Sequence, residues 1–312
     1  MPLYAVTGGA GFIGSHLVDD LLSDGHVVRV LDDLSTGRRE QLDTRAELLV
    51  ADIADPQALA RLVEGAAGVF HLAAIASVVR SVEDWAGTHR VNQTGTIVVL
   101  DAARRAGGIP VVYASSAAVY GDQPLLAHEQ LRPEPRSAYG VDKLGSELHA
   151  AVAFRVHGVP TAGFRFFNVY GPRQDPASPY SGVVSIFAGR IARHQKLTIH
   201  GDGGQTRDFV FVGDVVHQLR AGMGHLRASP DALVLNVCTG LGTTVLELAH
   251  AIGLAIGRPV SFDFAAAREV DIRFSVGDPT LGRTVLGTCA RTTLAEGLVS
   301  TLDATAAQTQ AA

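Results

Sequence analysis

The sequence predicts an α/β protein with a doubly wound parallel sheet and a smaller lobe interleaved mainly from its C-terminal part. Two observations lead to this fold class. Short apolar runs alternate with amphipathic stretches in the N-terminal half of the 312-residue chain, which is the pattern of repeated β-α units. The first unit also carries three glycines at three-residue spacing, which is typical of a nucleotide-binding turn between a strand and a helix.

That first unit begins with an apolar run, Leu3 to Val6, which leads to Gly8, Gly11 and Gly14. We expect Gly8 to allow a tight turn after the strand, Gly11 to let a pyrophosphate approach the backbone amides, and Gly14 to let the helix pack on the strand. The helix N-terminus would then face the anion with unpaired N–H groups. The sequence therefore predicts a phosphate-binding turn here.

A second apolar run ends at Asp32 and Asp33. An acid about 20 residues beyond the glycine turn binds a ribose 2′-hydroxyl in dinucleotide-binding units. No arginine directly follows Asp32 to receive a 2′-phosphate, so NAD is favoured over NADP. A glycine-rich turn that binds no nucleotide is disfavoured, because strand, turn, helix and acid all occur at the expected spacing.

Composition excludes several classes of protein. The 47% hydrophobic content excludes a disordered chain, and the net charge of −5 gives no reason to expect a nucleic acid or a membrane surface as partner. No apolar run is long enough to span a membrane, and we expect no signal peptide before the first strand. Cys238 and Cys289 match no metal or redox spacing. We expect a cytoplasmic protein without a metal site.

Further strands are expected over residues 47–50, 68–72 and 110–114. The first leads to Asp52, whose carboxylate either accepts a hydrogen bond from an adenine amino group or belongs to an ordinary turn. The second ends in HLAA, where small residues let the backbone approach a cofactor. Asp55 and Pro56 are expected to begin the next helix, and a later helix is expected over 91–106.

Polar residues follow at the edge where doubly wound sheets place their chemistry. Ser115 and Ser116 come at the carboxyl end of the strand over 110–114. Tyr139 and Lys143 lie four residues apart at the start of a helix that should run to about His157, so both side chains share one face. Such a pair is common by chance, and its place after a dinucleotide-binding half gives it weight.

The pattern changes after about residue 171, where prolines interrupt it. We expect residues 1–170 to form the dinucleotide-binding domain, with elements near 205–240 returning to it, and 171–312 to form mainly the substrate lobe. The expected helices cover 183–193, 214–227 and 244–256, and the expected strands cover 196–200, 209–212 and 234–237. The tail from about Thr301 lacks apolar periodicity and is expected to fray.

Seven motifs in order, TGGAGFIG, DDLSTG, HLAA, SSAAVYG, YGVDK, FFNVYGPRQ and RDFVFVGD, resemble those of the extended short-chain dehydrogenase/reductases, most closely the UDP-glucose 4-epimerase type. The resemblance covers about residues 3–290. It implies Tyr139 as base, Lys143 as stabiliser of the phenolate, and Ser116 as partner of the reacting hydroxyl. The implied reaction inverts C4 of a UDP-hexose, UDP-glucose or UDP-galactose or an enlarged derivative, through a transient 4-keto sugar, with NAD regenerated in each cycle.

The resemblance also implies two sets of binding residues. Those for NAD are Gly8, Gly11, Phe12, Ile13, Gly14, Asp32, Asp33, Ser35, Gly37, Asp52, Ile53, Leu72, Ala73, Ala74, Asn92, Tyr139 and Lys143. Those for the nucleotide sugar are Ser116, Asn168, Arg173, His200, Arg207 and Arg268. Arginine suits a diphosphate because its planar fork binds phosphate oxygens bidentately. The alternatives are an ion pair of Arg207 with Asp208, a loop ion pair for Arg173, and a packed strand-end histidine for His200.

One loop departs from the family pattern. Residues Arg268 to Asp271 read REVD, where the family often has Arg-x-Gly-Asp. Seven residues beyond Arg268, family members limited to UDP-glucose and UDP-galactose often place a tyrosine against the sugar. Ser275 occupies that position here, so we expect room for an N-acetyl or otherwise enlarged sugar.

Three other functions share some of these motifs. A nucleotide-sugar 4,6-dehydratase is disfavoured, because Ala117 and Ala118 stand where that group has an Asp-Glu pair. A UDP-glucuronate 4-epimerase or decarboxylase stays open, with Arg173 as a candidate for carboxylate recognition. A non-catalytic NAD-binding sensor is disfavoured because the Ser/Tyr/Lys set is complete. The resemblance also suggests a homodimer through the helices near 91–106 and 137–157, although their alanine-rich faces would equally suit internal packing.

Overall fold

A seven-stranded sheet with the order β11-β6-β5-β4-β1-β2-β3 forms the centre of the computed structural model, which describes residues 1–174, 182–267 and 272–311. Every pairing in this sheet is parallel. The strands are β1 (Leu3–Thr7), β2 (Val27–Asp32), β3 (Glu47–Val50), β4 (Gly68–His71), β5 (Val111–Ser116), β6 (Thr161–Phe166) and β11 (Ala232–Val237). The strand order reverses between β1 and β4, which confirms the doubly wound fold class and leaves a crevice at their carboxyl ends.

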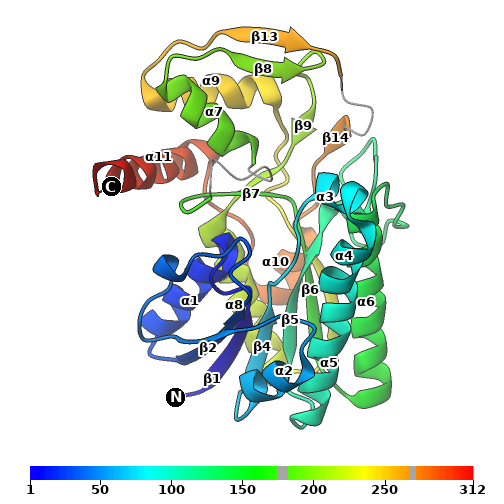
Figure 1. Ribbon diagram of the computed structural model, residues 1–312. Helices are drawn as coiled ribbons and strands as arrows, with labels where there is room; N and C mark the ends of the chain where they lie inside the picture. Colours follow the sequence, from blue (N-terminus) through cyan, green and yellow to red (C-terminus); the bar gives the residue numbers. More distant parts are fainter. Residues whose placement is uncertain (175–181, 268–271, 312) are drawn as a thin grey trace.

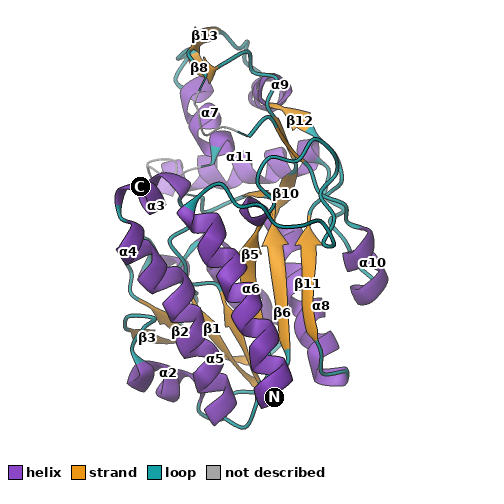
Figure 2. Ribbon diagram, turned by 90° about the vertical axis from the view of Figure 1, so that its right-hand side faces the viewer, coloured by secondary structure: helices purple, strands orange, loops and turns teal. Residues whose placement is uncertain are grey.

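Helices cover both faces of the sheet (Figures 1 and 2). One face carries α2 (Pro56–Val63), α5 (Gly95–Arg105) and α6 (Ala138–His157), and the other carries α1 (Phe12–Ser23) and α8 (Val212–Ala228). Successive strand residues point to opposite faces, so Ala5 belongs to the core under α2 and α5, whereas Val6 belongs to the core under α1 and α8. The remaining elements on this half are α3 (Val78–Glu83), α4 (Trp85–His89), a π-helical turn (Arg90–Thr94), α10 (Thr280–Leu286), and the short 3-10 helices Arg39–Gln41 and Ala117–Val119.

A second group of elements lies beyond the carboxyl edge of the sheet, at the top of Figure 1. It has its own core, formed around α7 (Val183–Ala192), α9 (Val245–Ile256) and α11 (Leu294–Ala311). Its strands are β7 (Asn168–Tyr170), β8 (Leu197–His200), β9 (Thr206–Arg207), β10 (Phe209–Phe211), β12 (Thr243–Thr244), β13 (Phe262–Ala265) and β14 (Phe274–Ser275). They form three small sheets, β10-β7, β12-β9-β14 and β13-β8.

Local signals set several helix ends. Asp55 caps α2 by accepting hydrogen bonds from the amides of Gln57 and Ala58, as its sequence context predicted. Thr244 and Glu247 form a reciprocal capping box at α9. The predictions missed the strand over 161–166 and the helices between 78 and 89.

The expectation of a frayed tail was wrong, because α11 continues as helix to Ala311. Its start carries a second capping box, in which Thr293 N–H donates to the Glu296 carboxylate and Glu296 N–H donates to the Thr293 hydroxyl. Alanine has the highest helix propensity, so this alanine-rich segment continues the helix without apolar periodicity.

Both cysteines are free, with Cys238 buried and Cys289 half-buried. Among the described helices, none has the length and apolar character required to cross a membrane.

Candidate active site

The glycine turn joins β1 to α1 at the crevice between β1 and β4. Gly8 has a positive φ of 69°, and a Cβ at this position would lie 2.6 Å from the Ala73 backbone nitrogen. A Cβ at Gly14 would collide with the Gly8 carbonyl oxygen. Gly11 precedes α1 as its N-cap, and only the Gly8 carbonyl, at 3.3 Å, lies near its Cβ position among the described residues. The turn therefore presents bare backbone and a helix N-terminus to the crevice.

Asp32 stands at the end of β2 and is only 7% exposed. Its carboxylate accepts hydrogen bonds at 2.9 Å from the amides of Ala10 and Leu34. Burial raises the pKa of this carboxyl, and the two backbone hydrogen bonds oppose the rise. Gly37 lies against it, because a Cβ there would be 2.8 Å from Asp32 Oδ1. Asp32 thus ties the glycine turn to the loop after β2 and keeps lone pairs for ligand hydroxyls.

Other predicted cofactor residues have protein partners. Asp33 accepts hydrogen bonds from both the amide and the hydroxyl of Ser35. Asp52 pairs with Arg90 at 2.8 Å. Ile53 is buried.

Asn92 is fully buried. Its side-chain amide accepts a hydrogen bond from the Ile75 N–H at 2.8 Å and donates one to the Ile75 carbonyl at 3.2 Å. Asn92 thus supports the loop after β4, which carries Leu72, Ala73 and Ala74, and its role at the cofactor stays a prediction.

His71, in the HLAA motif, supports the same loop. Its Nδ1 lies 2.8 Å from the Thr7 hydroxyl, and its Nε2 lies 3.0 Å from the Thr96 hydroxyl. Burial and the nearby charge of Lys143 lower the pKa of His71 to about 3. Thr7 in turn accepts from the Ala73 N–H at 3.3 Å. A neutral imidazole therefore links β1, β4 and α5 beneath the loop.

Ser116, Tyr139 and Lys143 come together at the carboxyl edge. Ser116 ends β5, and α6 begins beside it with Ser137 as N-cap. Gly140 permits this approach, since a Cβ there would lie 2.7 Å from the Ala118 carbonyl oxygen. Burial raises the pKa of Tyr139, and a side-chain hydrogen bond with Ser116 opposes the rise.

Lys143 lies behind Tyr139 and is 3% exposed. Its Nζ donates to the Ala114 carbonyl at 2.9 Å and lies 5.8 Å from the centre of the Tyr139 ring. Burial lowers the pKa of Lys143 to about 8, against the opposing effects of Asp142 and Glu147. The ammonium therefore keeps its charge at neutral pH, within range of the phenol.

The predicted substrate residues Asn168 and Arg207 lie on strands of two different small sheets in the second group. Asn168 begins β7, is exposed, and donates its backbone N–H to the Asp208 carbonyl at 2.9 Å. Arg207, in β9, is aligned with Ser275 of β14. Asp208 is fully buried, and its carboxylate accepts hydrogen bonds from the Thr239 amide and hydroxyl and the Gly240 amide at 2.7–2.9 Å. The alternative of an Arg207–Asp208 surface ion pair is therefore wrong.

Two other predicted substrate residues have partners within the protein. Arg173 pairs with Asp19 of α1 at 2.6 Å, so its charge serves the loop ion pair that was the alternative. His200 is half-buried at the end of β8, and its Nδ1 lies 3.2 Å from the Ala266 carbonyl, which is the packed alternative. Arg268 lies outside the described residues.

Glu147 and Arg165 were missed, although they form a buried ion pair next to the site at 2.7 Å. A signal was present for Glu147, because it follows Lys143 by four residues on a predicted helix and so shares its face. Arg165 offered none, since β6 itself was not predicted.

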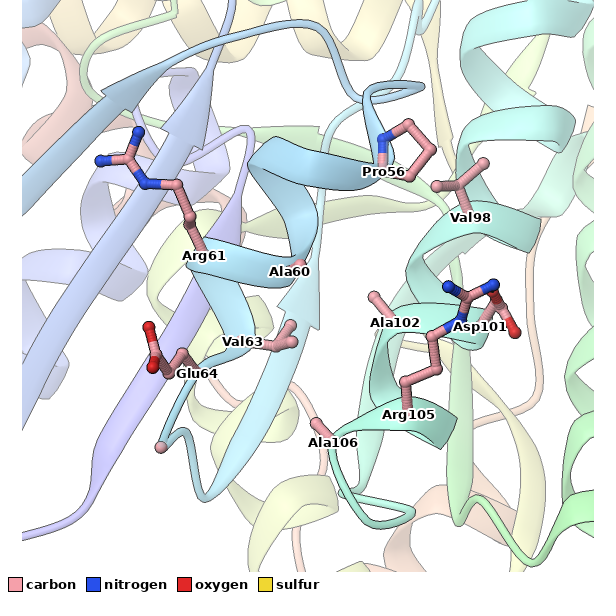
Figure 3. A pocket seen from close by; sticks show the side chains of 11 residues that line it. Pro56, Ala60, Arg61, Val63, Glu64, Val98, Asp101, Ala102, Arg105 and Ala106 are labelled. Atoms are coloured by element: carbon pink, nitrogen blue, oxygen red, sulfur yellow. The ribbon is translucent and has the colours of Figure 1, made fainter.

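A groove of about 660 Å³ lies elsewhere, between α2 and α5 (Figure 3). Val63, Val98 and Ala102 line its apolar part, with Arg61 and Arg105 at its edges. None of the candidate residues takes part in it, so it is separate from the site at the carboxyl edge.

The chain is similar to known proteins in both sequence and structure. Residues 4–238 match the model of the family described as the NAD dependent epimerase/dehydratase family. The chain is 41% identical over 307 residues to a UDP-glucose 4-epimerase of Mycolicibacterium smegmatis, with 96% of each chain covered. Its structure is similar to that of Thermotoga maritima UDP-glucose 4-epimerase with UDP-glucose, at a TM-score of 0.93, 35% identity and coverage of 99% and 100% of the two chains. It is also similar to Thermus thermophilus UDP-glucose 4-epimerase complexed with NAD, at a TM-score of 0.88, 36% identity and coverage of 97% and 98%.

Proposed function

Because the chain belongs to the NAD-dependent epimerase/dehydratase family, we propose that it is an NAD-dependent epimerase that inverts C4 of a UDP-hexose. The observation that carries the proposal is the grouping of Ser116, Tyr139 and Lys143 beside a bare glycine turn at one edge of the sheet. The elements up to about residue 170 would bind NAD, and those from 171 onward would mainly bind the nucleotide sugar.

The residues of the crevice fit NAD. Gly8, Gly11 and Gly14 leave backbone free for a pyrophosphate at the N-terminus of α1, and Asp32 offers a carboxylate to ribose hydroxyls. Bound NAD supplies the hydride acceptor and donor, and its positively charged nicotinamide ring adds to the charge that favours a phenolate. We propose the remaining residues of the implied set, with Asn92 acting through Ile75, as the walls of this site.

The protein groups then divide the proton chemistry among them. Tyr139 takes the proton of the sugar 4-hydroxyl, and Ser116 holds that hydroxyl by a hydrogen bond. A free phenol titrates near pH 10, and burial raises the pKa of Tyr139 further. The positive charge of Lys143, 5.8 Å from the ring centre, therefore has to stabilise the phenolate. Arg207 and Asn168 are proposed to hold the diphosphate and the sugar of the substrate.

One experiment tests the reaction. The purified protein, without added cofactor, is incubated separately with UDP-glucose, UDP-N-acetylglucosamine, UDP-glucuronate and dTDP-glucose, and the products are resolved by chromatography. A C4 epimer is the expected product, and it would show both that NAD copurifies and which sugar is preferred. Release of carbon dioxide or water would replace the proposal by a sister activity, and absence of any product even with added NAD would favour a non-catalytic sensor.

The alternative that acts on UDP-glucuronate loses its main support. It depended on Arg173 as the partner of a substrate carboxylate, and the guanidinium of Arg173 pairs with Asp19 on α1. The UDP-glucuronate arm of the experiment decides this point. We also propose a cytoplasmic location, since the two free cysteines suit a reducing compartment.

Ser275 is proposed to set the size of the sugar. It is aligned with Arg207 across β14 and β9, so its side chain borders the proposed diphosphate site. We expect Ser275→Tyr to lower kcat/KM for UDP-N-acetylglucosamine relative to UDP-glucose by roughly 10-fold or more, because the added ring fills the space of the N-acetyl group. Ser275→Ala, which keeps the space open, should preserve the ratio. An unchanged ratio in Ser275→Tyr would remove Ser275 from the specificity site.

We propose a homodimer that forms through α5 and α6, because their outer surface exposes apolar side chains. Leu148, Val152 and Val156 repeat every four residues on α6 and are 63%, 50% and 66% exposed. A groove of about 230 Å³ between α5 and α6 is lined by Ile97 and Val152 among others. An exposed apolar stripe of this kind marks an interface.

Sedimentation velocity at micromolar concentration should therefore give a dimer, and Val152→Glu should shift it towards monomer. Leu254→Glu is the matched control, because Leu254 is 85% exposed on α9, outside the proposed interface. A monomeric wild type would contradict the proposal.

A further inference from the structure

A buried carboxylate connects the elements that carry the proposed active-site residues. Glu147, on α6, is 6% exposed, and Arg165, on β6, is 4% exposed. Arg165 donates from Nε to Glu147 Oε1 at 2.9 Å and from Nη2 to Oε2 at 2.7 Å. Ser115, on β5, donates its hydroxyl to Glu147 Oε1 at 2.5 Å. The Glu147 side chain thus connects α6 to both β5 and β6, which are neighbouring strands.

These contacts involve residues next to Ser116 and Lys143 of the proposed active site. Ser115 precedes Ser116 in β5, and Glu147 follows Lys143 by one turn of α6. The far side of Arg165 is fixed as well, since its guanidinium carbon lies 4.7 Å from the centre of the Tyr120 ring. The Tyr120 hydroxyl donates to Asn236 Oδ1 at 2.7 Å. The network therefore locks β5, β6 and β11 to α6 at the edge where Ser116 and Tyr139 meet.

The carboxylate also contributes charge to that edge. Charged and titratable groups face Lys143 from each element packed on it: Tyr139, Asp142 and Glu147 on α6, neutral His71 on β4, and Arg165 behind Glu147 on β6. The nearest group on β5 is the Ala114 carbonyl. Asp142, the other anion, is already paired with His89 of α4 at 2.7 Å. Burial lowers the pKa of Lys143 to about 8, and Asp142 and Glu147 oppose this effect, so loss of the Glu147 charge would lower the pKa further.

We propose that Glu147 is a positioning residue for the epimerisation: its carboxylate fixes the Ser116 end of β5 against α6 and preserves the positive charge of Lys143 that the Tyr139 phenolate needs. The inference rests on the roles proposed above for Ser116, Tyr139 and Lys143. The proposed role differs from that of a purely structural ion pair, because Glu147 also favours the protonated form of the Lys143 side chain.

Glu147→Gln keeps the shape and one oxygen acceptor for Ser115 but removes the charge. We expect the alkaline limb of the kcat–pH profile to move down by about 1 pH unit, because a nearby anion favours the ammonium form by that order. Ser115→Ala keeps the charge and loses one tie to β5, so it should lower kcat severalfold without moving the limb. A Glu147→Gln profile identical in shape to the wild type would overturn the proposal.

Glu147→Gln leaves Arg165 buried without its partner carboxylate, which could itself unfold the site. The double variant Glu147→Gln with Arg165→Met tests for this effect. It removes both charges, so thermal stability and NAD content should recover relative to Glu147→Gln. The alkaline limb should lie between those of Glu147→Gln and the wild type, because the double variant removes the anion together with the cation that is paired with it. An alkaline limb lower in the double variant than in Glu147→Gln would contradict the inference, because removal of the Arg165 cation cannot disfavour the ammonium form of Lys143.

A readout without turnover separates this inference from the proposed reaction. The pKa of Lys143 is followed by NMR on protein labelled with ¹³C at lysine Cε, with Lys143→Arg used to assign the signal. We expect a lower pKa for Lys143 in Glu147→Gln than in the wild type and an unchanged one in Ser115→Ala. An unchanged pKa in Glu147→Gln contradicts the inference even if the epimerase is active, and a shifted one supports it even if the substrate proves to be another.

Discussion

Replacing Tyr139 with phenylalanine is expected to lower kcat for C4 epimerisation by roughly 10²- to 10⁴-fold, because a positioned acid or base contributes about that much to the rate. The change removes one oxygen and leaves the ring beside Lys143 in place. That oxygen is the partner of Ser116, so its loss removes the group that exchanges a proton with the sugar. Product formation from the preferred substrate of the panel, measured at saturating substrate, gives kcat directly.

Tyr170→Phe is the matched control for this prediction. Tyr170 is buried on β7, and its hydroxyl lies 3.4 Å from the Leu294 carbonyl, so the variant loses a buried hydroxyl outside the proposed site. Its kcat should stay near that of the wild type. NAD content after purification should match the wild type in both variants. Undiminished epimerisation by Tyr139→Phe, or full recovery on adding NAD, would show that Tyr139 is not the base.

Much of the dinucleotide-binding half was predictable because its signals are local. The turn at Gly8, the cap at Asp55 and the capping box begun by Thr244 each depend on a few consecutive residues. The apolar runs of the central strands are equally local, since strands buried on both faces are almost continuously hydrophobic. The fold class followed from these signals without knowledge of any long-range contact.

The site was predicted less completely, because several of its contacts join distant segments. Arg173 was assigned to substrate, yet its partner Asp19 lies on α1, more than 150 residues earlier in the chain. Asn92 was assigned to the cofactor, and its amide also binds the Ile75 backbone, 17 residues earlier in the same connection between β4 and α5. Such pairings arise only when the sheet assembles, so the residue type was informative and its partner was not.

The partners of Asp208, a residue that connects strands of the second group, also could not be predicted from the sequence. The sequence suggested a surface partner for Arg207, whereas the structure buries Asp208 completely and turns its carboxylate towards the turn at Thr239 and Gly240. The Gly277 amide also points to it, at 3.4 Å. The backbone of Asp208 donates to the Ser275 carbonyl and accepts from the Asn168 amide. Both the side chain and the backbone of Asp208 therefore hold the segments that carry the proposed substrate residues.

Asp208→Ala is accordingly expected to lower the free energy of unfolding by about 3–5 kcal/mol, because breaking a buried hydrogen-bond network is among the changes that destabilise a protein most. The reason is that the amides of Thr239 and Gly240 lose their acceptor inside the protein, and each unsatisfied buried donor costs about 1–3 kcal/mol. The measurement is urea unfolding followed by circular dichroism, with the melting temperature as a second readout. The KM for the nucleotide sugar should rise as well, since Arg207 and Ser275 lie on the strands that Asp208 joins.

Asp202→Ala is the control from the same part of the chain. Asp202 is exposed and pairs with exposed Arg273, and surface ion pairs contribute little to stability, so this variant should unfold close to the wild type. Asp208→Asn should fall between the two, because its amide keeps one oxygen as acceptor for Thr239 but presents N–H groups to other donors. Equal stability of Asp208→Ala and Asp202→Ala would mean that the carboxylate is not the anchor of this region, and the substrate residues would then have to be held by the strand pairing alone.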